Sequence, residues 1–250
     1  LSLHDALPIC VGERKTLLFR YAPRKRGVEK HLIAANVDTL LIVAAAAHPP
    51  FRPGLIDRFL ITAQLGNIAP IICLNKTDLA AEEPEELQLY RNLGVPICAT
   101  SCVTGEGIET LRGLLHNQTS VFAGHSGVGK SSLLNALDPE LRAYTREISE
   151  ATRNGKHATT AAWLYELAGN IRVIDTPGIR TLGLWKVGPE ELALYFPDIA
   201  EYSIQCRFRN CTHIHEPGCA VLEAVENNTL AAARYASYKR IRDSLETENK

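Results

Sequence analysis

The residues with the clearest chemical capacity form a glycine-rich segment in the middle of the chain. Residues 124–131 fit the pattern G-x-x-x-x-G-K-[ST], between an apolar run and an apolar helical segment. In this pattern the glycines let backbone N–H groups converge on phosphate oxygens at a helix N-terminus. Lys130 is expected to reach the β- and γ-phosphates, and Ser131 to ligate magnesium. The predicted phosphate-side residues are Gly124, His125, Ser126, Gly127, Val128, Gly129, Lys130, Ser131 and Ser132.

Further residues are expected around the phosphates and the magnesium ion. Asp175 follows the predicted strand 171–174 and begins Asp-Thr-Pro-Gly, which places an acid at a strand end where nucleotide-bound magnesium is held, and Gly178 closes that motif. Thr159 and Thr160 lie in a polar stretch, and either hydroxyl could ligate magnesium and sense the γ-phosphate; we assign the role to Thr160.

The base-reading residues come earlier in the chain. Asn75, Lys76, Thr77 and Asp78 form an Asn-Lys-x-Asp motif at the carboxyl end of a predicted strand, where open α/β sheets bind ligands. The aspartate can accept hydrogen bonds from the ring N–H and the exocyclic amine of guanine, an arrangement that adenine lacks, so ATP should bind poorly. A second base-side element is Thr100-Ser101-Cys102, of which Ser101 and Cys102 are assigned to binding; its alternative interpretation is a plain β–α turn.

The order of these motifs is unusual. In ordinary GTP-binding domains the phosphate loop precedes the base-reading motif, whereas here Asn75–Asp78 comes first and Gly124–Ser131 follows. The order predicts a circularly permuted domain, because a permuted chain rebuilds the same sheet when its original ends lay close together.

Four potential metal ligands gather near the C-terminus. Cys206, Cys211, His213 and Cys219 have the spacing C-x4-C-x-H-x5-C, which suits a closed tetrahedral zinc site. His215 is a rival imidazole, and buried cysteines in a small helical core are the alternative to a metal site. The remaining thiols, including Cys10, Cys73 and Cys102, are interpreted as ordinary core or loop cysteines.

The elements that must position these residues follow an α/β pattern. The chain has 250 residues, 46% of them hydrophobic, and a formal net charge of −1, which excludes disorder, coiled coil and binding of nucleic acid through overall charge. Its longest apolar run, 40–47, is too short to span a membrane. Strands are predicted at 40–44, 70–74, 95–99, 119–123, 163–167 and 171–174, and helices near 54–65, 82–93, 107–116, after 130, after 189 and from about 220.

Four segments are expected. The chain has no methionine, and residues 2–9 match a frame translation of a common sequencing adapter, so residues 1–9 are predicted to be non-native. Residues 10–30, rich in Lys and Arg, are interpreted as the end of a small β module and a basic linker. Residues 31–186 are predicted to form the permuted nucleotide domain, and residues 187–250 a helical zinc-binding domain.

With four motifs in this order and the Cys/His signature, the chain resembles the RsgA or YjeQ family of circularly permuted GTPases of small ribosomal subunit biogenesis. The resemblance covers about residues 11–245 and implies a remnant of an N-terminal OB-fold, a permuted G domain and a C-terminal zinc domain. It also implies hydrolysis of GTP to GDP with magnesium, and late maturation of the small (30S) ribosomal subunit with rRNA binding. A cytoplasmic monomer that binds no membrane is expected.

Two points stay open at this stage. Ile179 occupies the place where many GTPases carry a water-orienting Gln, so turnover should be slow, and His157 or Lys186 is the candidate water-activating group. The main alternative is a GTP-dependent RNA-binding switch with negligible hydrolysis, and a P-loop kinase or ATPase is opposed by Asn75–Asp78. RNA contacts are expected from the OB-fold that the resemblance implies, from Arg20–Lys30, and from Arg207, Arg209, Lys239 and Arg240.

Overall fold

The computed structural model describes residues 12–23, 28–140, 163–175, 184 and 187–248. Its centre is a six-stranded sheet in the order β5-β4-β3-β6-β8-β7, in which every pairing is parallel except β7 with β8. The strands are β3 (Thr39–Ala45), β4 (Ala69–Asn75), β5 (Ile97–Thr100), β6 (Thr119–Ala123), β7 (Trp163–Leu167) and β8 (Ile171–Asp175). The mixed α/β class and all six predicted strands are confirmed; β5 begins two residues later than expected.

Helices cover both faces of the sheet because its central strands are apolar on both sides. β3 is buried at every position: Leu40, Ile42 and Ala44 enter one core, and the alternate residues enter the other. The first core also contains residues of α1 (Pro53–Gly66) and α2 (Leu87–Asn92). The second contains residues of α3 (Ile108–Leu115) and α4 (Lys130–Leu137). The central strand β3 is thereby shielded from water on both faces.

The strand order confirms the circular permutation. The base-reading motif follows β4, and the phosphate loop follows β6, which comes later in the chain. Both strands pair in parallel with β3, one on each side, so their carboxyl ends meet at the same edge of the sheet. The motif order in the sequence is therefore reversed without separating the two halves of the site.

Two helix predictions need correction. The helix expected over 82–93 begins only at Leu87, because the segment before it forms turns: the N–H groups of residues 87–89 bond to carbonyls three residues back rather than four. The single final helix expected from about Ala220 is two helices, α7 (Ala220–Glu226) and α8 (Ala232–Glu248). Asn228 lies in the left-handed region with a φ of 57°, and the N–H groups of Thr229 and Leu230 both donate to the carbonyl of Ala224, which ends α7.

The basic segment within residues 10–30 also differs from the predicted linker, because most of the residues that the structure describes there belong to strands. β1 (Leu17–Pro23) and β2 (Val28–Ala35) form an antiparallel hairpin, with Leu17 opposite Ala35 and Pro23 opposite Val28. The boundary expected at residue 30 therefore falls inside a strand. Leu18 is fully buried in the core that also contains α1, so the hairpin is anchored on the nucleotide domain. Its origin in an OB-fold stays a prediction.

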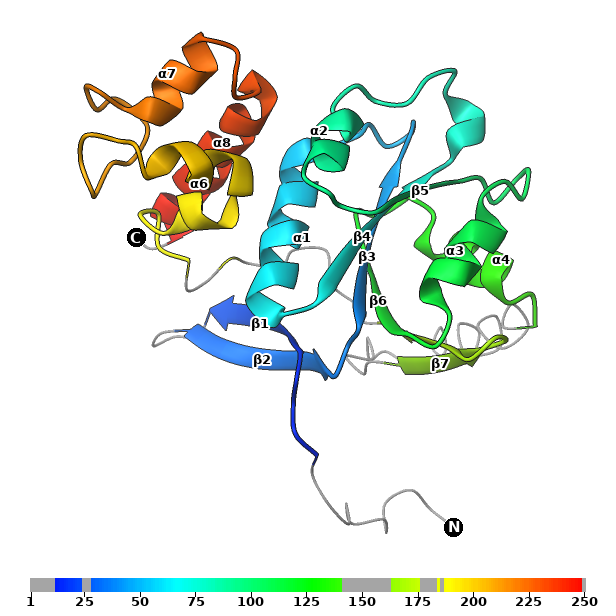
Figure 1. The fold of residues 1–250 in the computed structure, drawn as a ribbon. Coiled ribbons are helices and arrows are strands. Elements are labelled where there is room, and N and C mark those ends of the chain that lie inside the picture. Colours follow the sequence, from blue (N-terminus) through cyan, green and yellow to red (C-terminus); the bar gives the residue numbers. More distant parts are fainter. Residues whose placement is uncertain (1–11, 24–27, 141–162, 176–183, 185–186, 249–250) are drawn as a thin grey trace.

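The C-terminal helices form a second unit with its own core. They are η3 (Leu192–Tyr195), α6 (Pro197–Ser203), α7 and α8, and they lie beside α1 in Figure 1. Ile61 of α1 is part of this third core, so the two units share one helix. Among the described residues, every helix is too short or too polar to cross a membrane.

Candidate functional site

The phosphate loop leaves β6 and enters α4 through two positions where only glycine fits. Gly124 has a φ of 144°, and a Cβ there would collide with the carbonyl oxygen of Val43 on β3. Gly129 has a φ of 100°, and its Cβ would collide with the side-chain amide of Asn75. The loop is consequently held against both β3 and the base-reading motif.

Some side chains of the phosphate loop are buried or hydrogen-bonded to the loop backbone, and others are exposed to solvent. Val128 is buried, whereas Ser126 and Gly127 are exposed, as are Ser131 and Ser132 in the first turn of α4. Lys130 donates from Nζ to the carbonyl oxygens of Gly124, at 2.8 Å, and His125, at 3.0 Å, which places its ammonium over the loop. The structure thus brings all nine predicted phosphate-side residues together at a helix N-terminus, where an anion is stabilised.

Asn75 joins the base side to the phosphate side. Its side chain is 1% exposed, and its Nδ2 donates to the carbonyl oxygen of Val128 at 2.9 Å, across 53 residues of sequence. Its Oδ1 accepts from the hydroxyl of Thr100 at 3.1 Å and lies 3.6 Å from the Cys102 sulfur. Asn75 therefore aligns the two binding elements rather than contacting solvent. Thr100, which the sequence placed in the base-side element without a role of its own, supports it.

Asp78 is oriented by Ser101. The hydroxyl of Ser101 donates to Oδ1 of Asp78 at 2.5 Å, and it accepts from the backbone N–H groups of Val103 and Thr104, each at 3.2 Å. This leaves the second carboxylate oxygen of Asp78 for a ligand that offers N–H groups. Lys76, with a φ of 64°, donates from Nζ to the carbonyl of His48 at 2.5 Å, so the motif is also tied to the loop before α1.

Several predicted site residues lie outside the described part of the chain. They are His157, Thr159, Thr160, Gly178, Ile179 and Lys186. For Asp175, the description covers its backbone as the last residue of β8, next to the strand that feeds the phosphate loop. The roles assigned to Asp175 and to the residues outside the described part stay predictions.

The predicted metal ligands converge. One ligand atom from each of Cys206, Cys211, His213 and Cys219 lies within 4.8 Å of all the others. The Cys206 and Cys219 sulfurs are 3.8 Å apart, and each lies 3.5 Å from Nδ1 of His213. A tetrahedron with Zn–S near 2.3 Å and Zn–N near 2.0 Å has edges of about 3.8 and about 3.5 Å, so the donors fit zinc.

The loop that carries His213 is held in shape by a residue that sequence reasoning missed. Oε1 of Glu216 accepts from the backbone N–H of Thr212 at 2.8 Å and from its hydroxyl at 2.5 Å. Oε2 accepts from the N–H groups of Ile214, at 3.1 Å, and His215, at 3.2 Å. Burial would raise the pKa of Glu216, but these hydrogen bonds hold it well below its usual value. The sequence did offer a signal for this role, because Glu216 is an acidic residue between the predicted ligands His213 and Cys219.

His213 itself is prepared as a neutral ligand. Its φ of 59° is a left-handed conformation, and its carbonyl accepts from the hydroxyl of Tyr235 on α8 at 2.7 Å. Burial lowers its pKa, which favours the neutral imidazole that metals bind. His215, the rival imidazole, is exposed and outside the converging set. Cys73 and Cys98 are buried in the sheet, as expected of core thiols.

The fold and the two motifs define a class. A phosphate loop after β6, joined by Asn75 to a guanine-selective motif after β4, is the nucleotide site of a circularly permuted P-loop GTPase. The RsgA GTPase family profile matches residues 11–185.

Sequence relatives and solved structures agree with that match. The small ribosomal subunit biogenesis GTPase RsgA of Chlorobaculum parvum is 42% identical over 250 residues, covering 98% of this chain and 80% of the relative. The protein of that name from Porphyromonas gingivalis strain ATCC 33277 is 43% identical, with coverages of 99% and 87%. The crystal structure of YjeQ from Thermotoga maritima gives a TM-score of 0.70 at 35% identity, with 94% of this chain and 77% of that one covered.

A second solved structure, YloQ, is described as a circularly permuted GTPase and matches with a TM-score of 0.66 at 32% identity, covering 95% of this chain and 82% of that one. The chain therefore belongs to the RsgA GTPase family.

Proposed function

We propose that this GTPase acts in the biogenesis of the small ribosomal subunit, as a late maturation factor that binds the subunit and its rRNA and leaves after GTP is hydrolysed to GDP. The observation that carries the proposal is the intact, interlocked nucleotide site, with Asn75 bonded to the phosphate loop and Ser101 bonded to Asp78, in a chain whose relatives are named for this role. A cytoplasmic location and a monomeric state belong to the same proposal.

The proposed roles of the residues follow from their chemistry. Asp78 accepts hydrogen bonds from guanine, and Lys130 neutralises the β- and γ-phosphates. Ser131, Thr160 and Asp175 hold magnesium, and Gly178 donates its N–H near the γ-phosphate. The water is activated by His157 or Lys186, between which the choice stays open. Zinc is the proposed ion for Cys206, Cys211, His213 and Cys219, where it would stabilise the second unit.

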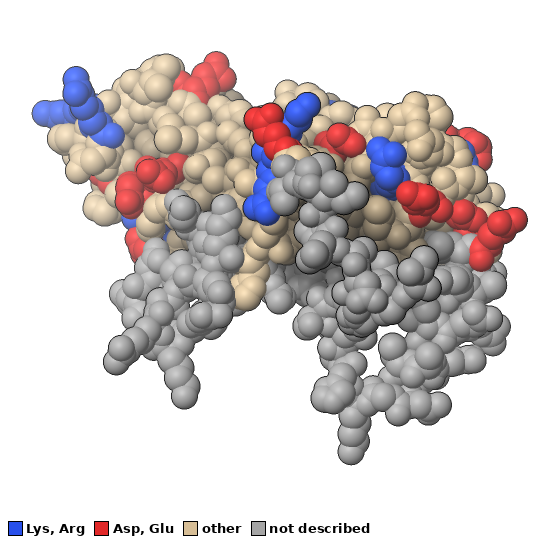
Figure 2. Space-filling view, turned by 90° about the horizontal axis from the view of Figure 1, so that it is seen from below, with Lys and Arg blue, Asp and Glu red and all other residues tan. Residues whose placement is uncertain are grey.

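RNA contact is proposed to be regional. On the described part of the face in Figure 2, Lys and Arg form separate groups among Asp and Glu rather than one continuous basic field. Arg207 and Arg209 are exposed beside the ligand Cys206, and Lys239 and Arg240 are exposed on α8. These side chains, with the segment Arg20–Lys30, are the proposed phosphate contacts, so affinity for the subunit should fall steeply as salt rises.

Phosphate release from GTP and from ATP, with and without purified small ribosomal subunits, tests the function. The expected result is slow turnover of GTP alone that rises with subunits. Lys130→Ala should abolish it, whereas Arg112→Ala, which removes an exposed ion pair with Glu109, should not change it. Binding of GTP and RNA without turnover under any condition would instead favour the switch, and turnover of ATP at a similar rate would contradict the assignment of Asp78.

A further inference from the structure

One face of α1 is devoted to the second unit. Gly54, Asp57, Arg58, Ile61 and Leu65 recur at helical spacing, and all of them lie toward that unit. A Cβ on Gly54 would lie 3.5 Å from the Ser237 hydroxyl, Arg58 hydrogen-bonds Ser244, and Ile61 and Leu65 belong to the third core. α1 is consequently a shared element of the two units.

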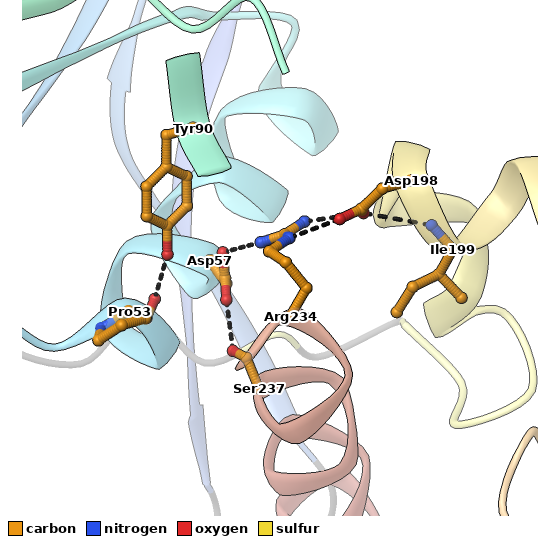
Figure 3. Close-up of polar contacts among 7 residues, drawn as sticks. All are labelled: Pro53, Asp57, Tyr90, Asp198, Ile199, Arg234 and Ser237. Atoms are coloured by element: carbon orange, nitrogen blue, oxygen red, sulfur yellow. Dashed lines mark hydrogen bonds and ion pairs between the residues drawn. The ribbon is translucent and has the colours of Figure 1, made fainter. Parts of the chain in front are cut away.

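A buried charge network lies at the centre of this face (Figure 3). The guanidinium of Arg234 on α8 donates to Asp57 on α1 and, through Nε at 2.8 Å, to Asp198 on α6. The Arg234 and Asp57 side chains are 4% and 1% exposed. Asp57 also accepts from Ser237, and the guanidinium carbon lies 4.7 Å from the centre of the Phe196 ring. Three elements of the chain are thereby fixed to one cation.

The network determines geometry more than it adds stability. Removing charges from water is costly, and buried ion pairs often contribute no more than an apolar group of the same size, while in some proteins they specify one arrangement. A pocket of about 280 Å³, partly open to solvent, lies beside the network and is lined by Asp57, Arg234, Gln64, Val95, Tyr195 and Phe196 among others. On this side of α1 the two units therefore meet through the bonds of Arg234 rather than through continuous packing.

The N-terminal end of α1, one turn before Asp57, lies beside the nucleotide site. The loop before α1 contains His48, whose carbonyl accepts from Lys76 of the base-reading motif. Pro49, Phe51 and Arg52 from the same loop line a small cavity with His125 and Val128 of the phosphate loop. Tyr90 donates its hydroxyl to the carbonyl of Pro53, the first residue of α1. α1 thus connects the loops of the nucleotide site to Arg234, the cation through which the second unit is bonded to this helix.

We propose that Arg234 is a positioning residue, which through Asp57 and Asp198 holds the Cys/His unit in one orientation on α1, so that the nucleotide site and the second unit meet the small subunit as one surface. The proposal rests on the proposed function, since the subunit is the partner that senses this orientation. Arg234 touches no substrate, and its effect is therefore expected on recognition of the partner and not on the chemistry of GTP.

The test variant combines Asp57→Asn with Arg234→Met in the full chain. The asparagine side chain keeps the shape of the aspartate and a partner for Ser237, and methionine fills the space of the arginine stem. Neither Asp57 nor Arg234 then leaves an unpaired buried charge, while Asp198, whose side chain is 20% exposed, keeps access to water. The control removes a surface pair of the same kind by Glu83→Gln with Arg91→Met, whose side chains are 39% and 40% exposed. Asp57→Asn alone is a second variant that retains the Arg234–Asp198 pair.

Two measurements decide the matter. Small-angle X-ray scattering should give one compact distance distribution for the parent and the control, and a broader one for the double variant. The small-subunit concentration for half-maximal stimulation of GTP hydrolysis should rise about tenfold in the double variant, within the usual range of couplings between sites. The GTP affinity and the rate without subunits should stay unchanged.

The possible failures are distinguishable. Unchanged scattering for the double variant overturns the proposal, because Arg234 then does not set the orientation. A broadened distribution with normal stimulation also overturns it, because the small subunit then does not sense that orientation. A parent protein that subunits do not stimulate contradicts the proposed function instead, and scattering then still decides whether Arg234 sets the orientation.

Discussion

Replacing Glu216→Gln is expected to weaken metal binding at the Cys/His cluster. The carboxylate of Glu216 accepts four hydrogen bonds, two at each oxygen, from the loop that carries His213. Glutamine retains one acceptor oxygen and presents an NH₂ group to the donors of the other, so two charge-assisted bonds are lost.

The size of the effect follows from those bonds. Hydrogen bonds to charged groups contribute about 1.5–3 kcal/mol each, and water replaces part of this at a half-exposed loop, which leaves a cost of about 3 kcal/mol. Because the ligand loop orders together with its metal, that cost appears as weaker binding, by about a hundredfold. Outer residues that hold metal ligands have effects of about this size in other proteins.

Competition with a chromophoric zinc chelator near neutral pH measures the affinity directly. Glu226→Gln is the matched control, because Glu226 is an exposed glutamate on the neighbouring helix α7. If Glu216→Gln binds zinc as tightly as the parent and the control, the carboxylate does not organise the loop. If the parent takes up no zinc, the metal assignment itself is wrong.

Three further outcomes are expected. Ser101→Ala removes the hydrogen bond that orients Asp78 and should weaken binding of guanine nucleotides about tenfold, measured by titration with a fluorescent GDP; unchanged affinity would mean that Asp78 is held by other contacts. Arg234→Met alone leaves Asp57 buried without its cation and should cost about 3–5 kcal/mol, which lowers the melting temperature by roughly 10 °C in calorimetry. Burial raises the pKa of Cys73 to about 12, so near neutral pH this thiol stays protonated and should resist iodoacetamide in the folded protein and react after unfolding, as followed by mass spectrometry.

The nucleotide site was predictable because its residues act through local motifs. The turn at Gly129, the lysine that follows it and the Asn-Lys-x-Asp motif each lie within a few residues of a strand end, and their chemistry is carried by the backbone next to them. The Cys/His cluster was predictable for the same reason, since three thiolates and one imidazole within fourteen residues leave few uses other than a metal site.

The missed features depend on partners far away in the sequence. Nothing near Asp57 indicates that its cation is Arg234, 177 residues later on another helix. The break between α7 and α8 depended on a weak signal, the pair Asn227 and Asn228, because asparagine tolerates the left-handed backbone that ends a helix. The hairpin of β1 and β2 was foreseen only as the end of a small β module, because the charges between Arg20 and Lys30 resemble those of a solvated linker.

The contact between Asn75 and Val128 explains how the permuted order remains compatible with one nucleotide site. β4 and β6 flank the same strand, β3, so the base-reading motif and the phosphate loop end at one edge whichever comes first in the chain. The hydrogen bond from Asn75 to Val128 and the close approach of Gly129 then align the two elements directly, without help from the chain connection between them. A different order changes which loops are covalently continuous, and in this chain it leads from β8 to the second unit, whose core includes part of α1. The permutation thus preserves the guanine site while placing the Cys/His unit directly after the strand that ends in Asp175.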